Sequence, residues 1–249
     1  MATDAPLHAP SDSDSDSDSD SYLDADARAS DCLEQLIAGH RRYQRGEPVH
    51  YQNAGKDREH YADHQCPRVA VLACADSRVP PEIIFDQKIG HLFVLRVAGN
   101  FADDDNQASM EYALQHFTPP PALIVVLGHE RCGAVKAAVD CFDPHPQLSP
   151  SHGPAPSSRL LALVGRLEEA VLGTKAPDAS PGSAPAPADA GAHALRIDQA
   201  VRRNVMINVD KIRANPVIRQ AGVWVMGGRY DLDTGEIEWL TDPPSRGGA

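Results

Sequence analysis

Three apolar runs rich in β-branched residues restrict what this chain can fold into more than any other feature. They read RVAVLAC (68–74), HLFVLRVAG (91–99) and ALIVVLGH (122–129). A strand with one solvated face alternates apolar and polar residues, whereas these runs are continuously apolar, as in strands covered on both faces. Helical patterns separate them, NQASMEYALQHF (106–117) and CGAVKAAVDCF (132–142). The sequence therefore predicts an α/β fold with a mostly parallel central β-sheet flanked by helices.

Two further helices and a hairpin complete the predicted fold. The first helix, ASDCLEQLIAGHRRYQRG (29–46), places its apolar residues near one face, and Ser30 or Asp31 can cap it. The other helix, LRIDQAVRRNVMINVDKIRANP (195–216), repeats apolar residues at helical spacing until a proline stops it. After it, GVWVMGGRYDL and EIEWL join through Asp-Thr-Gly, a turn sequence that predicts a C-terminal antiparallel hairpin.

Composition divides the chain into one domain and two polar segments. Residues 1–26, which contain SDSDSDSDSD, have too few apolar side chains to offset the entropy cost of folding, so we expect a disordered acidic tail. Residues 27–249 are expected to form a single domain, because the 249-residue chain is 42% hydrophobic. Within that domain, a helical stretch (157–173) precedes a proline- and alanine-rich segment, about 173–194, which we expect to be a mobile surface excursion.

The negative charge of the chain is concentrated near its start. The formal net charge is -12, of which -8 lies within residues 1–31, so the remainder is nearly balanced. It holds no basic cluster that favours a nucleic acid partner. No run approaches the roughly 20 apolar residues of a membrane helix, and no basic stretch followed by an apolar core marks a secretory signal. We therefore expect a cytoplasmic protein whose partners are neither nucleic acids nor membranes.

The five cysteines are expected to be thiols rather than a disulfide framework. Their number is odd, and no secretory signal accompanies them. Cys32, Cys66 and Cys141 match no motif, and we interpret them as small buried residues.

Metal-binding residue types end two of the three apolar runs. Cys74 closes the first run, and His129 and Cys132 close the third. In open parallel sheets, ligands bind outside the carboxyl ends of the strands, where residues distant in sequence converge. Two cysteines and one histidine suit Zn²⁺ and leave a fourth position for water, as in catalytic zinc sites. A cysteine at a strand end is more often a small buried residue, and the His-x-x-Cys pair alone is a weak motif.

Asp76 and Arg78 favour a catalytic zinc site over a cysteine that is only a buried residue. If the chain stays extended after Cys74, alternation places Asp76 and Arg78 on the same side as the cysteine. A carboxylate near the metal can accept a hydrogen bond from its water, and an adjacent guanidinium keeps that carboxylate ionised. Asp76 can instead occupy the fourth zinc position, which would close the site to substrate.

The same residues resemble those of a known enzyme family. CADSRVPPE (74–82), RVAGN (96–100) and GHERCGAV (128–135), in this order and spacing, resemble the signatures of the β-class carbonic anhydrases. The resemblance runs from about Leu33 to the C-terminal hairpin. It implies one Zn²⁺ per subunit, bound by the two cysteines and the histidine named above, with the aspartate and arginine as a catalytic dyad. It also implies a zinc-dependent lyase that reversibly hydrates CO₂ to bicarbonate and a proton.

Four more residues receive roles from this resemblance. Gln65 matches a glutamine that donates a hydrogen bond to a substrate oxygen, and Phe93 and Tyr112 match aromatic residues that wall an apolar CO₂ pocket. Gly133 matches a glycine whose backbone N–H faces the substrate. Because the family shares this pocket across a dimer interface, the resemblance implies a homodimer or a dimer-based higher oligomer. Gln65 can equally be a cap, and the two aromatic residues can be ordinary core residues.

Departures from the family pattern leave alternatives open. Val71 stands where some relatives carry a tryptophan that marks an allosteric bicarbonate site, although Arg96 matches the arginine of that site. The absence of that tryptophan favours a subtype without the allosteric bicarbonate site. Carbonyl sulfide and carbon disulfide hydrolases use the same framework, and a zinc-stabilised binding protein without turnover is a third interpretation. The intact Asp76 and Arg78 argue against the third, because a structural zinc site closes its fourth position.

Overall fold

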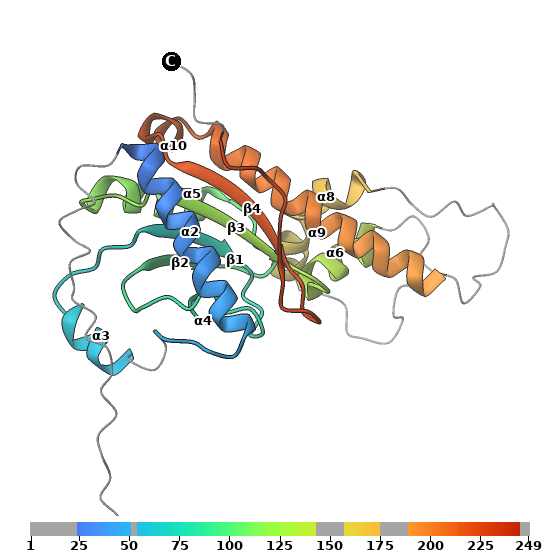
Figure 1. Ribbon diagram of the computed structural model, residues 1–249. Coiled ribbons are helices and arrows are strands. Elements are labelled where there is room, and N and C mark those ends of the chain that lie inside the picture. Colours follow the sequence, from blue (N-terminus) through green and yellow to red (C-terminus); the bar gives the residue numbers. More distant parts are fainter. Residues whose placement is uncertain (1–23, 51–53, 143–156, 175–188, 245–249) are drawn as a thin grey trace, which may run out of the picture.

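A computed structural model describes residues 24–50, 54–142, 157–174 and 189–244 (Figure 1). Most of the expected acidic tail and much of the expected excursion lie outside these residues. The strands are β1 (Val69–Ala73), β2 (Leu92–Arg96), β3 (Leu123–His129), β4 (Trp224–Tyr230) and β5 (Ile237–Trp239). The helices are α2 (Ala25–Gln44), α3 (Ala54–His60), α4 (Pro81–Ile84), α5 (Asp104–His116), α6 (Gly133–Phe142), α7 (Ser158–Gly165), α8 (Glu168–Leu172), α9 (Asp189–Ala214) and α10 (Pro216–Ala221).

The five strands form one sheet in the order β2-β1-β3-β4-β5. The first four strands are parallel, and β5 pairs with β4 in the antiparallel sense. Figure 1 shows α2 crossing in front of the strands. This arrangement confirms the predicted fold class, including the C-terminal hairpin.

Both faces of the sheet are covered, which explains why the strand sequences do not alternate. Val69, Val71 and Ala73 of β1 belong to a core cluster that includes the buried side of α2. Ala70 and Leu72, the residues between them, belong to a second cluster with α5, α9 and α10. Successive side chains of a strand point to opposite faces, so each position of β1 enters one of two apolar cores.

Helix α2 begins earlier than its sequence pattern predicts. Asp24 is the N-cap, and its side chain accepts a hydrogen bond from the backbone N–H of Ala27 at 2.7 Å. Ser30 and Asp31 therefore lie inside the helix, and the prediction that one of them caps it is wrong. The added first turn is anchored from outside, because Trp224 donates its indole N–H to Asp26 at 2.8 Å. The helix thus extends across the expected boundary of the acidic tail.

The predicted excursion also ends earlier than expected. Helix α9 starts at Asp189, so residues 189–194 continue the long helix instead of the excursion. His193 contributes to this, because its Nε2 lies 3.0 Å from a carboxylate oxygen of Asp140 on α6. The stretch 157–173 forms two short helices, α7 and α8, instead of one.

Helix α9 packs closely on the centre of the sheet because two strand residues are glycines. A Cβ atom at Gly128 would lie 2.6 Å from Val205 of α9, and one at Gly227 would lie 2.7 Å from the same valine. Any side chain at either position would push α9 away from the sheet. Among the described helices, none combines the length and the hydropathy that crossing a bilayer requires.

Candidate metal centre

The three predicted metal ligands meet at the carboxyl edge of the sheet. Cys74 follows β1, His129 is the last residue of β3, and Cys132 lies just before α6. Because β1 and β3 are neighbouring parallel strands, their carboxyl ends bring these side chains together. The two Sγ atoms are 3.9 Å apart, and a ring nitrogen of His129 lies within 4.8 Å of both. All three residues are buried.

One ring nitrogen of His129 is available to a cation. The other, Nδ1, lies 2.9 Å from the backbone oxygen of Glu130. Because a carbonyl oxygen only accepts hydrogen bonds, Nδ1 carries the proton and Nε2 carries a lone pair. Nε2 is buried and has no hydrogen-bond partner among the described residues. A buried polar atom without a partner is costly, and a metal ion beside the two sulfurs would satisfy it.

The two sulfurs also suit a cation. A hydrogen bond from the Cys132 thiol lowers the pKa of Cys74 to about 4, although burial opposes this shift. His129 and the backbone N–H of Gly99, which lies 3.3 Å from Cys74 Sγ, lower it further. The pKa of Cys132 is raised, because it holds the proton that the pair shares. A divalent cation favours the thiolate form of both residues.

This donor set fits Zn²⁺. Two thiolate sulfurs and one imidazole nitrogen are ligands that zinc prefers, and the three side chains come from two rigid strand ends. Three protein ligands leave one position for water or substrate. A zinc site of this kind is typical of catalysis, since structural zinc sites use four protein ligands.

Asp76 lies beside the cluster and is held there by Arg78. Its Oδ1 accepts hydrogen bonds from the Nε and the backbone N–H of Arg78, both at 2.9 Å, and its Oδ2 accepts from Nη2 at 2.7 Å. The same Oδ2 lies 3.8 Å from Nε2 of His129. The guanidinium of Arg78 holds the pKa of Asp76 well below its usual range, so this carboxylate stays ionised.

Arg96 fixes the backbone that carries Cys74 and Asp76. It donates from Nε to the carbonyl oxygen of Cys74 at 2.9 Å and from Nη2 to the carbonyl oxygen of Asp76 at 2.5 Å. The strand register explains this contact, because Arg96 is paired with Ala73 across the β1–β2 ladder. Val71, three residues before Cys74, is fully buried in the core.

Two buried asparagines of α9 support the other side of the centre, and sequence reasoning missed them. Asn204 donates from Nδ2 to the carbonyl oxygen of Gly99, and Asn208 accepts from the backbone N–H of Ala102, both at 2.7 Å. Gly99 in turn donates to Cys74 Sγ. The signal available in the sequence was their spacing of four residues within an otherwise apolar helix face.

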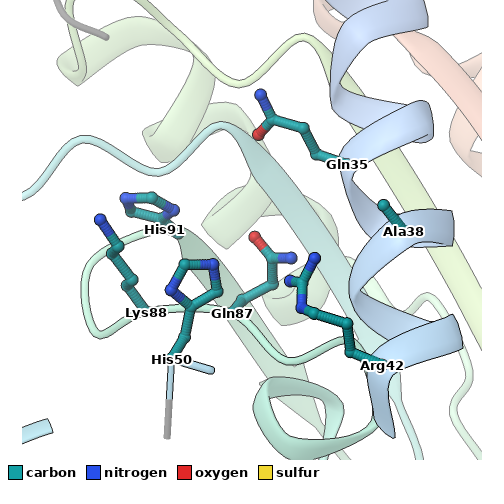
Figure 2. A pocket seen from close by; sticks show the side chains of 7 residues that line it. All are labelled: Gln35, Ala38, Arg42, His50, Gln87, Lys88 and His91. Atoms are coloured by element: carbon teal, nitrogen blue, oxygen red, sulfur yellow. The ribbon is translucent and has the colours of Figure 1, made fainter. Parts of the chain in front are cut away.

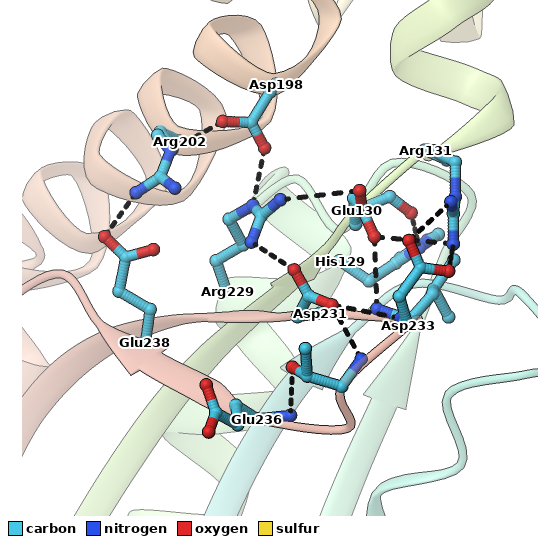
Figure 3. A network of polar contacts seen from close by, with 12 residues as sticks. His129, Glu130, Arg131, Asp198, Arg202, Arg229, Asp231, Asp233, Glu236 and Glu238 are labelled. Carbon is cyan, nitrogen blue, oxygen red and sulfur yellow. Dashed lines mark hydrogen bonds and ion pairs between the residues drawn. The ribbon is translucent and has the colours of Figure 1, made fainter. Parts of the chain in front are cut away.

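Sequence reasoning also missed a clamp on the segment between His129 and Cys132 (Figure 3). Arg131 reaches the β4–β5 turn and donates to both carboxylate oxygens of Asp233, at 2.9 and 2.6 Å. The backbone N–H of Glu130 donates to the carbonyl oxygen of Tyr230 at 2.8 Å. Arg131 has a φ of 52°, a left-handed conformation that a non-glycine residue rarely adopts without support. The hairpin thus holds the tight turn that aims two metal ligands.

Three of the four predicted substrate residues lie far from the metal ligands of the same chain. Gln65 precedes β1, whose five residues span about 16 Å before Cys74. Phe93 and Tyr112 both contact the ring of Phe117, with ring centroids 5.8 and 5.9 Å apart. Phe117 and Gln65 line the same surface hollow. Phe93 and Tyr112 therefore pack on Phe117 at the amino edge of the sheet, and Gln65 lines the same hollow as Phe117.

Gly133 and the cysteines outside the metal centre are the remaining positions that the sequence singled out. Gly133 begins α6 next to Cys132, and apart from its chain neighbours and its own helix no atom lies within 4 Å of where a Cβ would be, so this position faces open space. Cys32 is buried as expected, and its thiol donates to the carbonyl oxygen of Arg68. Cys66 is only partly buried and Cys141 is exposed, so the interpretation as a buried residue is not confirmed for Cys66 and is wrong for Cys141.

Comparison with sequence families and curated proteins identifies relatives. A family model described as carbonic anhydrase matches residues 69–237. The carbonic anhydrase of Mycolicibacterium smegmatis is 39% identical over 137 residues, which cover 55% of this chain and 62% of that protein. That of Pseudomonas aeruginosa is 29% identical over 218 residues, 84% of this chain and 87% of that protein. The chain spans less than two thirds of the length of the mycobacterial relatives it matches.

Solved structures agree on the fold. A tetrameric β-carbonic anhydrase from Sordaria macrospora superposes with a TM-score of 0.58 at 24% identity, over 76% of this chain and 89% of that chain. A Coccomyxa β-carbonic anhydrase in complex with acetazolamide gives a TM-score of 0.58 at 24% identity, over 77% and 80%. Enzymes of this class depend on zinc, which matches the donor set described above. The chain therefore belongs to the carbonic anhydrase family and has the fold of its β class.

Proposed function

We propose that this protein catalyses the reversible hydration of CO₂ to bicarbonate and a proton at the centre formed by Cys74, His129 and Cys132. The observation that carries this proposal is the geometry around Nε2 of His129. That buried nitrogen has no partner among the described residues, faces two sulfurs, and lies 3.8 Å from the carboxylate of Asp76. Family membership supports the same reaction.

Zinc bound by these three residues would act as a Lewis acid that lowers the pKa of a water molecule toward neutrality. Because two thiolates neutralise the charge of the cation, an additional acceptor is required. Asp76 fits this role, since its pKa is lowered and its Oδ2 is directed toward the cluster. In our proposal it accepts a hydrogen bond from the attacking water and keeps a lone pair of that water aimed at carbon.

Arg78 determines which role Asp76 plays. Both oxygens of Asp76 accept hydrogen bonds from Arg78, so the carboxylate would have to break a bidentate pair before it could bind a metal. This pairing supports the open form, in which Asp76 orients water. Gly133 supplies the second polar group, because the first N–H groups of a helix have no acceptor within it and can donate to a developing carboxylate oxygen.

We further propose that a second copy of the chain completes the substrate pocket. Gln65, Phe93 and Tyr112 lie at the amino edge of the sheet, away from the metal ligands of their own chain. Tyr112 is also about half exposed, so its ring is accessible to a second chain. A homodimer that places the amino edge of one protomer beside the carboxyl edge of its partner would bring these residues to CO₂.

The reaction is tested by measuring CO₂ hydration and zinc content on the same preparations of wild type and Asp76→Asn. The substitution keeps the size of the side chain and its acceptor oxygen but removes the charge. We expect about one zinc per chain in both proteins and a kcat about 10²–10³-fold lower in the variant. Full zinc occupancy without hydration by the wild type, or undiminished turnover in the variant, would refute the proposal.

A further inference from the structure

A small hollow separate from the metal centre is lined mainly by basic and polar side chains (Figure 2). Its volume is about 160 Å³. One wall is the outer face of α2, and the others are the segment that follows α2 and the loop between α4 and β2. The lining residues are Gln35, Ala38, Arg42, His50, Gln87, Lys88 and His91. None of them lies in the metal centre.

The charge of this hollow contrasts with that of the chain. Arg42 and Lys88 are cations, His50 and His91 can become cations, and no carboxylate is among the described residues that line it. The chain carries a formal net charge of -12, of which -8 lies within residues 1–31, so the remaining residues have only a small negative excess. Figure 2 shows that the basic side chains come from different segments, with His50 between Arg42 and Lys88 in this view. A cavity lined by cations without a carboxylate favours a negatively charged ligand.

A buried carboxylate holds the cavity in shape. Asp86 is 1% exposed and accepts hydrogen bonds from Nε of Arg42 at 2.6 Å and from the backbone N–H groups of Val49 and His50 at 3.1 and 3.0 Å. It therefore orients the guanidinium and ties the segment that carries His50 to the opposite wall. Within the described residues, no hydrogen bond engages Nη1 of Arg42. The site is thus preorganised, with donor capacity left over.

His50 lies within the field of both the cations and the carboxylates around the cavity. Burial lowers the pKa of His50, and the nearby cations Arg42 and Lys88 lower it further. Asp86 opposes this shift more strongly than either cation promotes it, and burial is the largest cause of the lowered pKa. An anion in the cavity would offset the repulsion between these cations and would favour a protonated His50.

We infer that this hollow is a binding site for a small oxyanion of the phosphate class. A tetrahedral dianion fits within about 160 Å³ and has enough acceptor oxygens to engage Arg42, Lys88 and His50 at once. Guanidinium and ammonium groups are the side chains that most often bind phosphate oxygens. The volume exceeds that of the bare ion, so the ligand is either free phosphate with water or a small phosphate monoester.

The test is phosphate binding to the full-length, zinc-loaded protein at constant ionic strength. Calorimetry with inorganic phosphate should show one site per chain, and the imidazole resonance of His50 should shift with the same dissociation constant. A parallel titration with glycerol 3-phosphate distinguishes the two sources. Equal affinity indicates the free ion, and tighter binding indicates a monoester.

Two substitutions place negative charge in the cavity without touching the metal centre. Lys88→Glu removes a cation, and Ala38→Glu puts a carboxylate one helical turn before Arg42, within reach of its guanidinium. Each should weaken phosphate binding about tenfold or more. Ala38→Gln matches the second variant in size without charge. Lys211→Glu matches the first in charge on a distant exposed lysine of α9. Both controls should bind within about twofold of wild type.

The zinc-loaded metal centre is the same in all five proteins, so anion binding at zinc would not distinguish them. Equal phosphate affinity in Lys88→Glu and Lys211→Glu would therefore overturn the inference. So would saturable binding that leaves the His50 resonance unchanged, or the absence of binding at millimolar phosphate.

Discussion

The carboxyl and amino edges of the sheet carry different parts of the predicted site. At the carboxyl edge, one chain alone brings together Cys74, His129 and Cys132, with ligand atoms within 4.8 Å of one another. At the amino edge, Gln65 lies a full strand length from those ligands. The difference indicates that the fold of a single chain is sufficient to build a metal centre. A complete substrate pocket, in our proposal, needs the amino edge of a second copy.

Removing one metal ligand should produce the largest loss. Cys74→Ser replaces a thiolate with a hydroxyl, which zinc binds poorly, so we expect zinc content to fall well below one per chain and hydration to drop by about 10³-fold or more. Metal analysis and stopped-flow hydration measure both quantities. Cys141→Ser is the matched control, because Cys141 is exposed and outside the metal centre. Retained zinc and activity in Cys74→Ser would show that the carboxyl edge of the sheet does not hold the metal centre.

Gln65→Ala tests the amino edge and should have a smaller effect. We expect zinc to stay bound and kcat/KM to fall by about 10–100-fold, since one hydrogen bond to substrate is lost. Size-exclusion chromatography with light scattering should show a dimer or a larger even oligomer for wild type and variant. A monomer with wild-type activity would contradict the shared pocket.

Mixing two defective chains separates a shared pocket from a pocket within one chain. Cys74→Ser chains keep Gln65, and Gln65→Ala chains keep the metal ligands. If the pocket is shared, random reassortment makes half of the dimers mixed, each with one intact site, and recovers about a quarter of wild-type activity. If Gln65 acts within its own chain, mixed dimers contain no intact site and activity does not recover.

Arg131→Ala should have the smallest effect at the carboxyl edge. It removes the bidentate contact with Asp233 that holds the turn between two metal ligands. The pair is exposed and screened by salt, so we expect unchanged zinc content but loss of zinc to a chelator about threefold faster than in wild type. Arg58→Ala, which breaks an exposed pair with Glu59, is the control. Equal zinc loss in both variants would show that the hairpin clamp does not support the centre.

Sequence patterns predicted the carboxyl edge well because the relevant information is local. A continuous apolar run identifies a covered parallel strand, and the residue types at its end are read directly from the sequence. Because parallel strands share one carboxyl edge, Cys74 and His129 had to be neighbours once their strands were adjacent. The pairing of Asp76 with Arg78 could also be predicted, because the two residues are only two positions apart in sequence. The structure contains this ion pair.

The same reasoning could not place the amino edge. Gln65 is only nine residues from Cys74 in sequence, yet β1 lies between them and sends them to opposite edges. Resemblance gave Phe93 and Tyr112 a role without saying which chain each site takes them from. The clamp between Arg131 and Asp233 joins residues about a hundred positions apart, a contact that no local pattern encodes.

X-ray absorption at the zinc edge of the wild-type protein reports which atoms bind the metal. We expect one zinc per chain with two sulfur neighbours at about 2.3 Å, one imidazole nitrogen at about 2.0 Å, and one light-atom neighbour that bromide or another exchangeable ligand can replace. A first shell without sulfur, or one in which four protein ligands leave nothing exchangeable, would contradict this expectation.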